Sequence, residues 1–166
     1  MERLRRHIEL VANIAIIVVA VLLCVVLVKR FVFPPTQTQL SPGIVAGTPV
    51  AIPNVDWSKS DRTLVLALQK DCHFCTDSAP FYRTLVTAAA AKSIRLVAVL
   101  PQEESVGREY LNGLNVQIGE VRQLPLNSIH VRGTPTLILV NKAGTIIKSW
   151  VGKLPENEEK ELLSTL

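Results

Sequence analysis

Two cysteines three positions apart are the part of this sequence with the clearest chemistry. Cys72 and Cys75 enclose His73 and Phe74 and follow a short apolar run. Two thiols at positions i and i+3 of a helix start can close a small disulfide ring, and the first lies where free backbone amides and the helix dipole stabilise a thiolate. Because the thiolate is the form that attacks disulfides, this placement favours thiol–disulfide exchange.

Two other uses of a cysteine pair fit the sequence less well. A structural zinc site needs about four ligands, and the chain has no second cysteine pair, only His73 and His130 as further candidates. Structural disulfides usually close longer loops than this one. The third cysteine, Cys24, lies in a long apolar segment, and we expect it to take no part.

Strands and helices alternate around the pair. An apolar run of strand length at residues 63–68 precedes it and predicts a strand buried on both faces of a sheet. Apolar residues at three- and four-residue spacing predict a helix over 76–92. The remaining predicted elements are strands at 94–100, 136–140 and 145–151, and helices at 103–114 and from Pro155 onwards. This order predicts an α/β fold, with helices packed on a mixed sheet.

Several motifs resemble the thioredoxin superfamily, over about residues 60–166. The family also has a kink-forming proline five residues after its second cysteine, as Pro80 is here, and the segment around Thr134-Pro135 resembles its cis-proline loop. The resemblance implies a thioredoxin-like fold and a cis peptide bond at Pro135, facing the cysteines. It also implies that the backbone of Thr134 is offered to an incoming substrate chain.

The chain departs from plain thioredoxin in three ways. Sixty positions separate Cys75 from Pro135, and this extra length resembles the insertion of membrane-anchored thioredoxin-like proteins, which include reductases of cytochrome c maturation. Leu66 stands where thioredoxin has a buried Asp, and Asp71 where it has a Trp before the first cysteine. Proton transfer at Cys75 must therefore use another group or water.

The residues around the pair receive distinct roles. We predict that Cys72 attacks and that Cys75 resolves the resulting mixed disulfide. His73, if protonated, stabilises the Cys72 thiolate; the alternative is a solvated histidine. Asp71 acts in the opposite sense, raising the thiol pKa by like-charge repulsion. Phe74 caps the site or meets apolar substrate, with packing as the alternative.

Outside the site, we expect packing roles for Trp57 and Trp150 and a surface or capping role for His130.

The N-terminal segment predicts a membrane anchor. Residues 10–28 form an uncharged run of 19 residues, about 28 Å long as a helix and close to the hydrocarbon thickness of a bilayer. A cleaved signal peptide is the alternative, but no small-residue cleavage pattern follows the run. We therefore predict a transmembrane signal anchor at 1–30, with basic residues before it favouring a cytoplasmic N-terminus and an exported C-terminal domain.

Composition agrees with this division. The 166 residues are 48% hydrophobic and 19% charged, with a mean hydropathy of +0.31. Five Lys and Arg residues against two Glu fall within 1–30, so +3 of the net charge of +4 flanks the apolar run and indicates no nucleic-acid surface. Residues 31–47 lack charge and are rich in proline, which predicts an extended tether before a domain at 48–166. Residues 50–52 are a candidate edge strand.

The favoured function is a thiol–disulfide oxidoreductase in the bacterial inner membrane, single-pass, with its domain in the periplasm or outside. Its partners would be exported protein thiols and disulfides and an electron donor or acceptor in the membrane. No cofactor is expected beyond a Cys72–Cys75 disulfide. Two alternatives remain. The first is a thiol peroxidase. Such enzymes carry a threonine three positions before the reactive cysteine, where this chain has Gln69. A copper-binding assembly factor of thioredoxin fold would need a third ligand besides the two cysteines.

Overall fold

The computed structural model describes residues 17, 19, 21 and 44–166. The predicted anchor at 1–30 lies outside the described residues except for three helical, exposed positions, Ile17, Val19 and Val21. Most of the predicted tether and Cys24 also lie outside them. Among the described residues, no helix combines the length and apolarity needed to cross a membrane.

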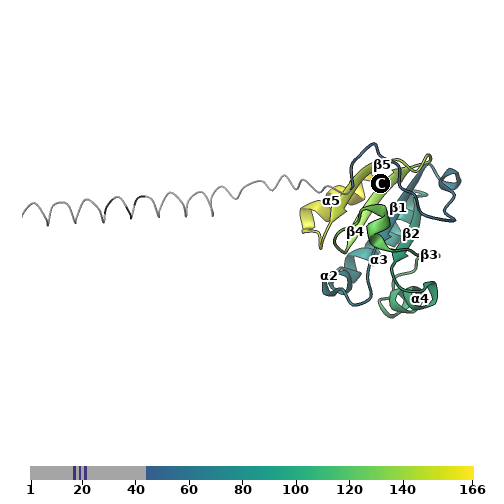
Figure 1. Cartoon of the computed structure of the whole chain (residues 1–166), viewed down its shortest axis with the longest axis horizontal. Coiled ribbons are helices and arrows are strands. Elements are labelled where there is room, and N and C mark those ends of the chain that lie inside the picture. The colour runs from purple at the N-terminus through teal and green to yellow at the C-terminus, as the bar shows by residue number, and fades with distance from the viewer. Residues whose placement is uncertain (1–16, 18, 20, 22–43) are drawn as a thin grey trace, which may run out of the picture. The chain divides into compact units, whose positions relative to one another are not determined.

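A five-stranded mixed sheet forms the centre of the C-terminal unit, with the strand order β3-β2-β1-β4-β5 (Figure 1). β1 pairs in parallel with β2, and β2 with β3, whereas β4 runs antiparallel to both β1 and β5. The strands are β1 (Arg62–Ala67), β2 (Arg95–Leu100), β3 (Glu120–Gln123), β4 (Thr136–Asn141) and β5 (Ile146–Val151). The predicted α/β fold with a mixed sheet is confirmed.

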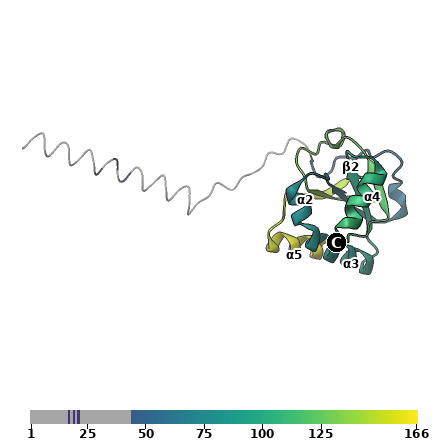
Figure 2. The ribbon, with the colours of Figure 1, turned by 90° about the horizontal axis from the view of Figure 1, so that it is seen from below.

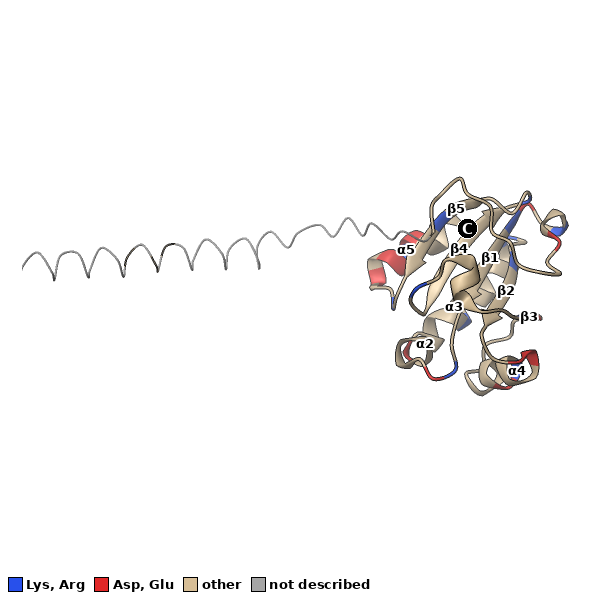
Figure 3. Cartoon of the chain, in the orientation of Figure 1, with Lys and Arg blue, Asp and Glu red and all other residues tan. Residues whose placement is uncertain are grey.

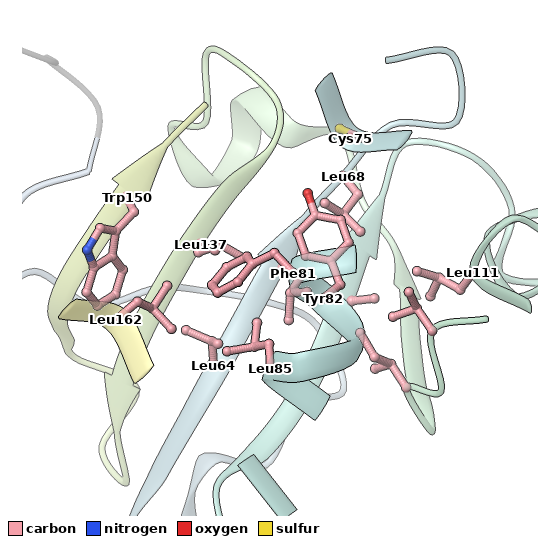
Figure 4. Packing of buried hydrophobic residues seen from close by; sticks show 14 of the residues in the cluster. Leu64, Leu68, Cys75, Phe81, Tyr82, Leu85, Leu111, Leu137, Trp150 and Leu162 are labelled. Carbon is pink, nitrogen blue, oxygen red and sulfur yellow. The ribbon is translucent and has the colours of Figure 1, made fainter. Parts of the chain in front are cut away.

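The helices lie along one face of this sheet (Figure 2). They are α2 (His73–Asp77), α3 (Ala79–Ala91), α4 (Glu104–Gly113) and α5 (Glu156–Thr165). Two short 3-10 helices, η1 (Trp57–Lys59) and η2 (Leu126–Ile129), pack on the opposite face. Their apolar side chains and those of the sheet form one buried cluster, which includes Leu64, Leu66, Tyr82, Leu85, Leu111, Leu137, Trp150 and Leu162 (Figure 4). Cys75 belongs to the same cluster.

Irregular chain covers the opposite face. Val50 and Ile52 pack there with Val65, Val97 and Ile138, together with residues of the segment 124–131. The prediction of an edge strand at 50–52 is wrong: the only pairing of this segment is an isolated bridge between Pro49 and Thr145. Val50 donates one backbone hydrogen bond to the carbonyl of Gly144 at 2.8 Å. Pro49 and Pro53 lack the amide hydrogen that a longer ladder needs.

The helix predicted over 76–92 is two helices in the structure. α2 begins at His73, earlier than predicted, and ends at Asp77, and α3 begins at Ala79. The Ser78 hydroxyl donates to the Phe74 carbonyl at 2.8 Å at this break. Pro80, at the start of α3, has no amide hydrogen to continue the α2 pattern. The break leaves α2 as a five-residue helix that carries both cysteines at its start.

Other predictions from single residues hold. Trp150 is buried in the helix-side core, and Trp57 packs against the other side near Gly144. His130 is exposed and caps the end of η2 in a left-handed conformation. The acidic first turn of α5 lies at the positive end of its helix dipole, and Figure 3 shows these acidic residues in red on the ribbon of α5.

Candidate active site

Strand register brings the two halves of the site together. β1 ends at Ala67, and the loop after it leads to Cys72. β4 is antiparallel to β1, so its first residue, Thr136, is paired with Ala67 at the end of β1. The residues just before β4, Thr134 and Pro135, therefore lie beside the start of α2, although they are some sixty positions away in sequence.

Cys72 caps the N-terminus of α2. Its sulfur accepts a hydrogen bond from the Cys75 backbone amide at 3.2 Å, and its thiol donates to the Thr134 carbonyl at 3.2 Å. The side chain is partly buried, with both cysteines free. The prediction that Cys72 occupies the helix start is confirmed.

The pKa of Cys72 lies below its ordinary value. Burial raises it, but hydrogen bonds from the side chains of Cys75 and Thr134 and from the backbone of Cys75 and Phe74 together lower it by more. All these groups come from the helix start and the loop before β4. The site thus stabilises a thiolate at Cys72 through local hydrogen-bond donors.

Cys75 has the opposite environment. Its side chain is fully buried, one turn into the helix. Burial, and next the hydrogen bond with the Cys72 side chain, raises the pKa of Cys75 to about 12. Cys72 is therefore the more acidic and the more accessible thiol of the pair.

The peptide bond between Thr134 and Pro135 is cis, as the resemblance implied. The contact between the Thr134 carbonyl and Cys72 places this loop directly at the thiol. The residues Thr134, Pro135, Cys72 and Cys75 thus come together as predicted, while their roles toward a substrate remain predictions.

The side chains of His73 and Asp71 make no hydrogen bond to the Cys72 sulfur. His73 instead approaches Asp77 on the next turn, with Nε2 to Oδ2 at 3.3 Å, and its side chain is 81% exposed. Lys153 contacts the same Asp77 carboxylate at 3.3 Å. The described contacts favour the solvated alternative for His73. Phe74 is 56% exposed and lies against the His73 ring, so core packing is not its role.

Two tyrosines near the pair were missed by the sequence analysis. The hydroxyl of Tyr110, from α4, forms a hydrogen bond with the hydroxyl of Thr76 on α2 at 3.2 Å. This bond connects α4 to α2, the helix that carries the cysteines. Tyr82, from α3, is buried in the same cluster as Cys75. The spacing of Cys75, Ser78 and Tyr82 along the chain, i, i+3 and i+7, was the available signal, since such residues share a helix face.

Metal ligands do not cluster in the part of the chain that the structure describes. No group of three or more His, Cys, Asp and Glu side chains is placed there to hold a metal ion.

Solved structures of other proteins have a fold similar to that of this chain. No protein-family model matches the chain, and no curated protein does, but solved structures do. The thioredoxin domain of a thiol-disulfide oxidoreductase from Bacteroides vulgatus aligns with a TM-score of 0.58 and 16% identity, covering 74% of this chain and 97% of that one. A putative thiol:disulfide interchange protein DsbE from Chlorobium tepidum gives 0.54 and 21%, covering 74% and 96%. StoA from Bacillus subtilis gives 0.51 and 19%, covering 68% and 84%.

These similarities define the class: the domain has a thioredoxin-like fold, and the fold that the sequence motifs predicted is confirmed. Within that fold, its cysteine pair stands at the start of the helix that follows β1.

The acidity difference predicts selective alkylation. In the reduced full-length chain, iodoacetamide should modify Cys72 at a lower pH than an ordinary cysteine, because a lowered pKa leaves more thiolate at each pH. Burial raises the pKa of Cys75 to about 12, so this thiol is protonated at neutral pH and should stay unmodified. Peptide mass spectrometry over a pH series measures both rates. Equal rates at the two cysteines would contradict the assignment.

Proposed function

We propose that the chain is a thiol–disulfide oxidoreductase that exchanges disulfides with exported protein substrates through Cys72 and Cys75. The observation that carries the proposal is the split within the pair. Cys72 is partly exposed with a lowered pKa, while Cys75 is fully buried with a raised one. An attacking thiol needs access and thiolate character, whereas a resolving thiol needs only to reach its neighbour.

The exchange proceeds through a mixed disulfide. For a reducing turnover, the Cys72 thiolate attacks one sulfur of a substrate disulfide, forming a Cys72–substrate bond and releasing the other substrate sulfur as a thiolate. Cys75 then loses its proton and attacks the Cys72 sulfur, which forms the Cys72–Cys75 disulfide and releases the second substrate thiol. The substrate gains two electrons and the pair loses two. An oxidising turnover is the same sequence in reverse, with the pair as the redox group.

We assign substrate contacts to the residues around Cys72. The Thr134 carbonyl, next to Pro135, already accepts a hydrogen bond from Cys72 and is placed to bind the backbone of an incoming chain. Phe74 offers an exposed apolar ring on the same helix start, and His73 a polar one. Together they make a site for an extended polypeptide rather than a small molecule.

Redox equilibration tests the proposal directly. The full-length chain in mild detergent, incubated in glutathione buffers of graded potential, should convert between dithiol and Cys72–Cys75 disulfide with a two-electron slope. Related folds span about −270 to −120 mV, and the midpoint determines whether the chain donates or accepts electrons in its compartment. Absence of such cycling, together with stoichiometric copper uptake, would favour the copper-binding assembly factor. Rapid consumption of hydroperoxide would favour the thiol peroxidase.

We also propose that the domain is tethered outside the inner membrane of a bacterium and exchanges electrons with a membrane partner. The support is the uncharged run at 10–28 and the uncharged, proline-rich stretch at 31–47.

Fractionation tests this location. The full-length chain should sediment with the membranes, resist extraction at high salt, and have its domain digested by protease added to spheroplasts. A soluble product shortened at its N-terminus would show a cleaved signal peptide instead. A domain shielded from protease would show the opposite orientation.

A further inference from the structure

A buried hydroxyl without a partner lies beneath the cysteine pair. Tyr82 is 1% exposed, and its hydroxyl oxygen has no hydrogen-bond partner among the described residues. The Ser78 hydroxyl, which donates to the Phe74 carbonyl, lies close enough to lower the pKa of Tyr82, but it forms no hydrogen bond with the Tyr82 hydroxyl. Buried polar groups in native proteins are nearly always satisfied, so an unpartnered one calls for a functional explanation.

The hydroxyl points toward the part of the core that holds the buried thiol (Figure 4). In Figure 4 the phenol ring of Tyr82 points its oxygen toward the side of the core where Cys75 lies. The pKa of Tyr82 is raised, first by burial and then by the charge of a nearby Cys75 thiolate. A phenol with a raised pKa stays protonated near neutral pH, which makes it a permanent hydrogen-bond donor.

Cys75 needs such a donor in the proposed reaction. In both directions of exchange, the electron pair of the Cys72–Cys75 bond resides on the Cys75 sulfur in a buried site, where an unpaired charge is unfavourable. No Asp or Glu is buried among the described residues, and the position of thioredoxin's buried carboxylate is occupied by Leu66, which is fully buried.

We propose that Tyr82 is a positioning residue for this exchange, whose hydroxyl donates a hydrogen bond to the Cys75 thiolate whenever that thiolate forms. The inference rests on the proposed oxidoreductase function. When an external thiolate attacks Cys72 in the oxidised pair, the new sulfur–sulfur bond forms at Cys72, the Cys72–Cys75 bond breaks, and its electron pair moves to Cys75. Tyr82 keeps its proton throughout and stabilises the leaving thiolate, which later takes a proton from water.

The test compares Tyr82→Phe with a matched control, Thr63→Val. Thr63 carries another buried hydroxyl without a partner, but it lies at the start of β1, away from the cysteines that follow the end of that strand. The full-length chain is oxidised, treated with dithiothreitol, quenched with acid, and scored for Cys72 and Cys75 alkylation by mass spectrometry. Tyr82→Phe should slow reduction of the pair about tenfold, the expected loss for one hydrogen bond to a charged group, and Thr63→Val should leave the rate unchanged.

A second readout separates this role from a structural one. The alkylation rate of reduced Cys72 should stay within about twofold in Tyr82→Phe, since Cys72 is held by other donors. A loss of fold would change both rates together. The proposal is wrong if the disulfide of Tyr82→Phe is reduced at the rate of the unsubstituted chain. It is also wrong if disulfide reduction and Cys72 alkylation slow by the same factor.

Fluorotyrosine provides a version of the test that preserves shape. The chain has two tyrosines, so in a Tyr110→Phe background Tyr82 is the only one left. Biosynthetic replacement by 3-fluorotyrosine makes the phenol more acidic and a stronger donor, and should speed reduction of the disulfide. An unchanged rate would overturn the proposal. An unsubstituted chain that never cycles between dithiol and disulfide would overturn the proposed function, and this inference with it.

Discussion

Replacing Cys75 by Ser should turn the chain into a trap for its protein substrates. Cys72 keeps its place at the helix start, and the Thr134 and backbone groups that lower its pKa remain, so it still attacks a substrate disulfide. A serine hydroxyl cannot resolve the mixed disulfide, which therefore accumulates. Expression of Cys75→Ser in an oxidising compartment, followed by non-reducing gels, should show higher-mass adducts that disappear on reduction.

The matched variant is Cys72→Ser. Here the remaining thiol of the pair is fully buried, with a pKa of about 12, so it neither reaches an external disulfide nor supplies thiolate to attack it. Adducts should fall to the background of a variant lacking both cysteines. Equal trapping by Cys75→Ser and Cys72→Ser would refute the division of roles between the two thiols.

The site could be predicted from the sequence because its parts are marked by local patterns. The apolar run before Cys72 predicted β1 to within a residue at each end, since a doubly buried strand must be apolar throughout. The motif around Thr134 and Pro135 was recognisable as a loop before a second such strand. Antiparallel pairing of β4 with β1 then brings the loop to the helix start.

The sequence analysis missed β3, a strand that is stabilised by pairing with its neighbour rather than by an apolar run of its own. β3 has only one buried residue, Val121, so it shows no apolar run. It is held by its parallel ladder with β2 and by the ion pair between Arg95 and Glu120. The ion pair joins residues that are far apart in sequence, and no local signal predicts it.

The environment of single polar groups was also beyond the sequence. The sequence analysis missed Tyr82, and only the three-dimensional packing shows that its hydroxyl is buried without a hydrogen-bond partner. The influence of His73 on Cys72 was left open for the same reason. The structure pairs His73 with Asp77, a contact that competes with any effect on the thiol.

Leu85→Ala should cause a large loss of stability while leaving the site residues in place. Leu85 is fully buried on α3, between the helix and the sheet, near Leu64 and Phe81 (Figure 4). Truncating a buried leucine to alanine costs about 2–5 kcal/mol, because apolar burial is lost and a cavity remains. Against a typical unfolding free energy of about 5–15 kcal/mol, this is a large share.

Urea unfolding of the full-length chain in detergent, followed by tryptophan fluorescence, measures this loss, since Trp150 is buried in the same core. The control is Thr87→Ala, an exposed position on the same helix, where the free energy of unfolding should change by less than about 0.5 kcal/mol. Because α3 follows directly on the cysteine-bearing helix, Leu85→Ala should also expose Cys75 to alkylation at urea concentrations where the Thr87→Ala chain still protects it. Similar midpoints for the two variants would show that α3 is not held on the sheet by this core.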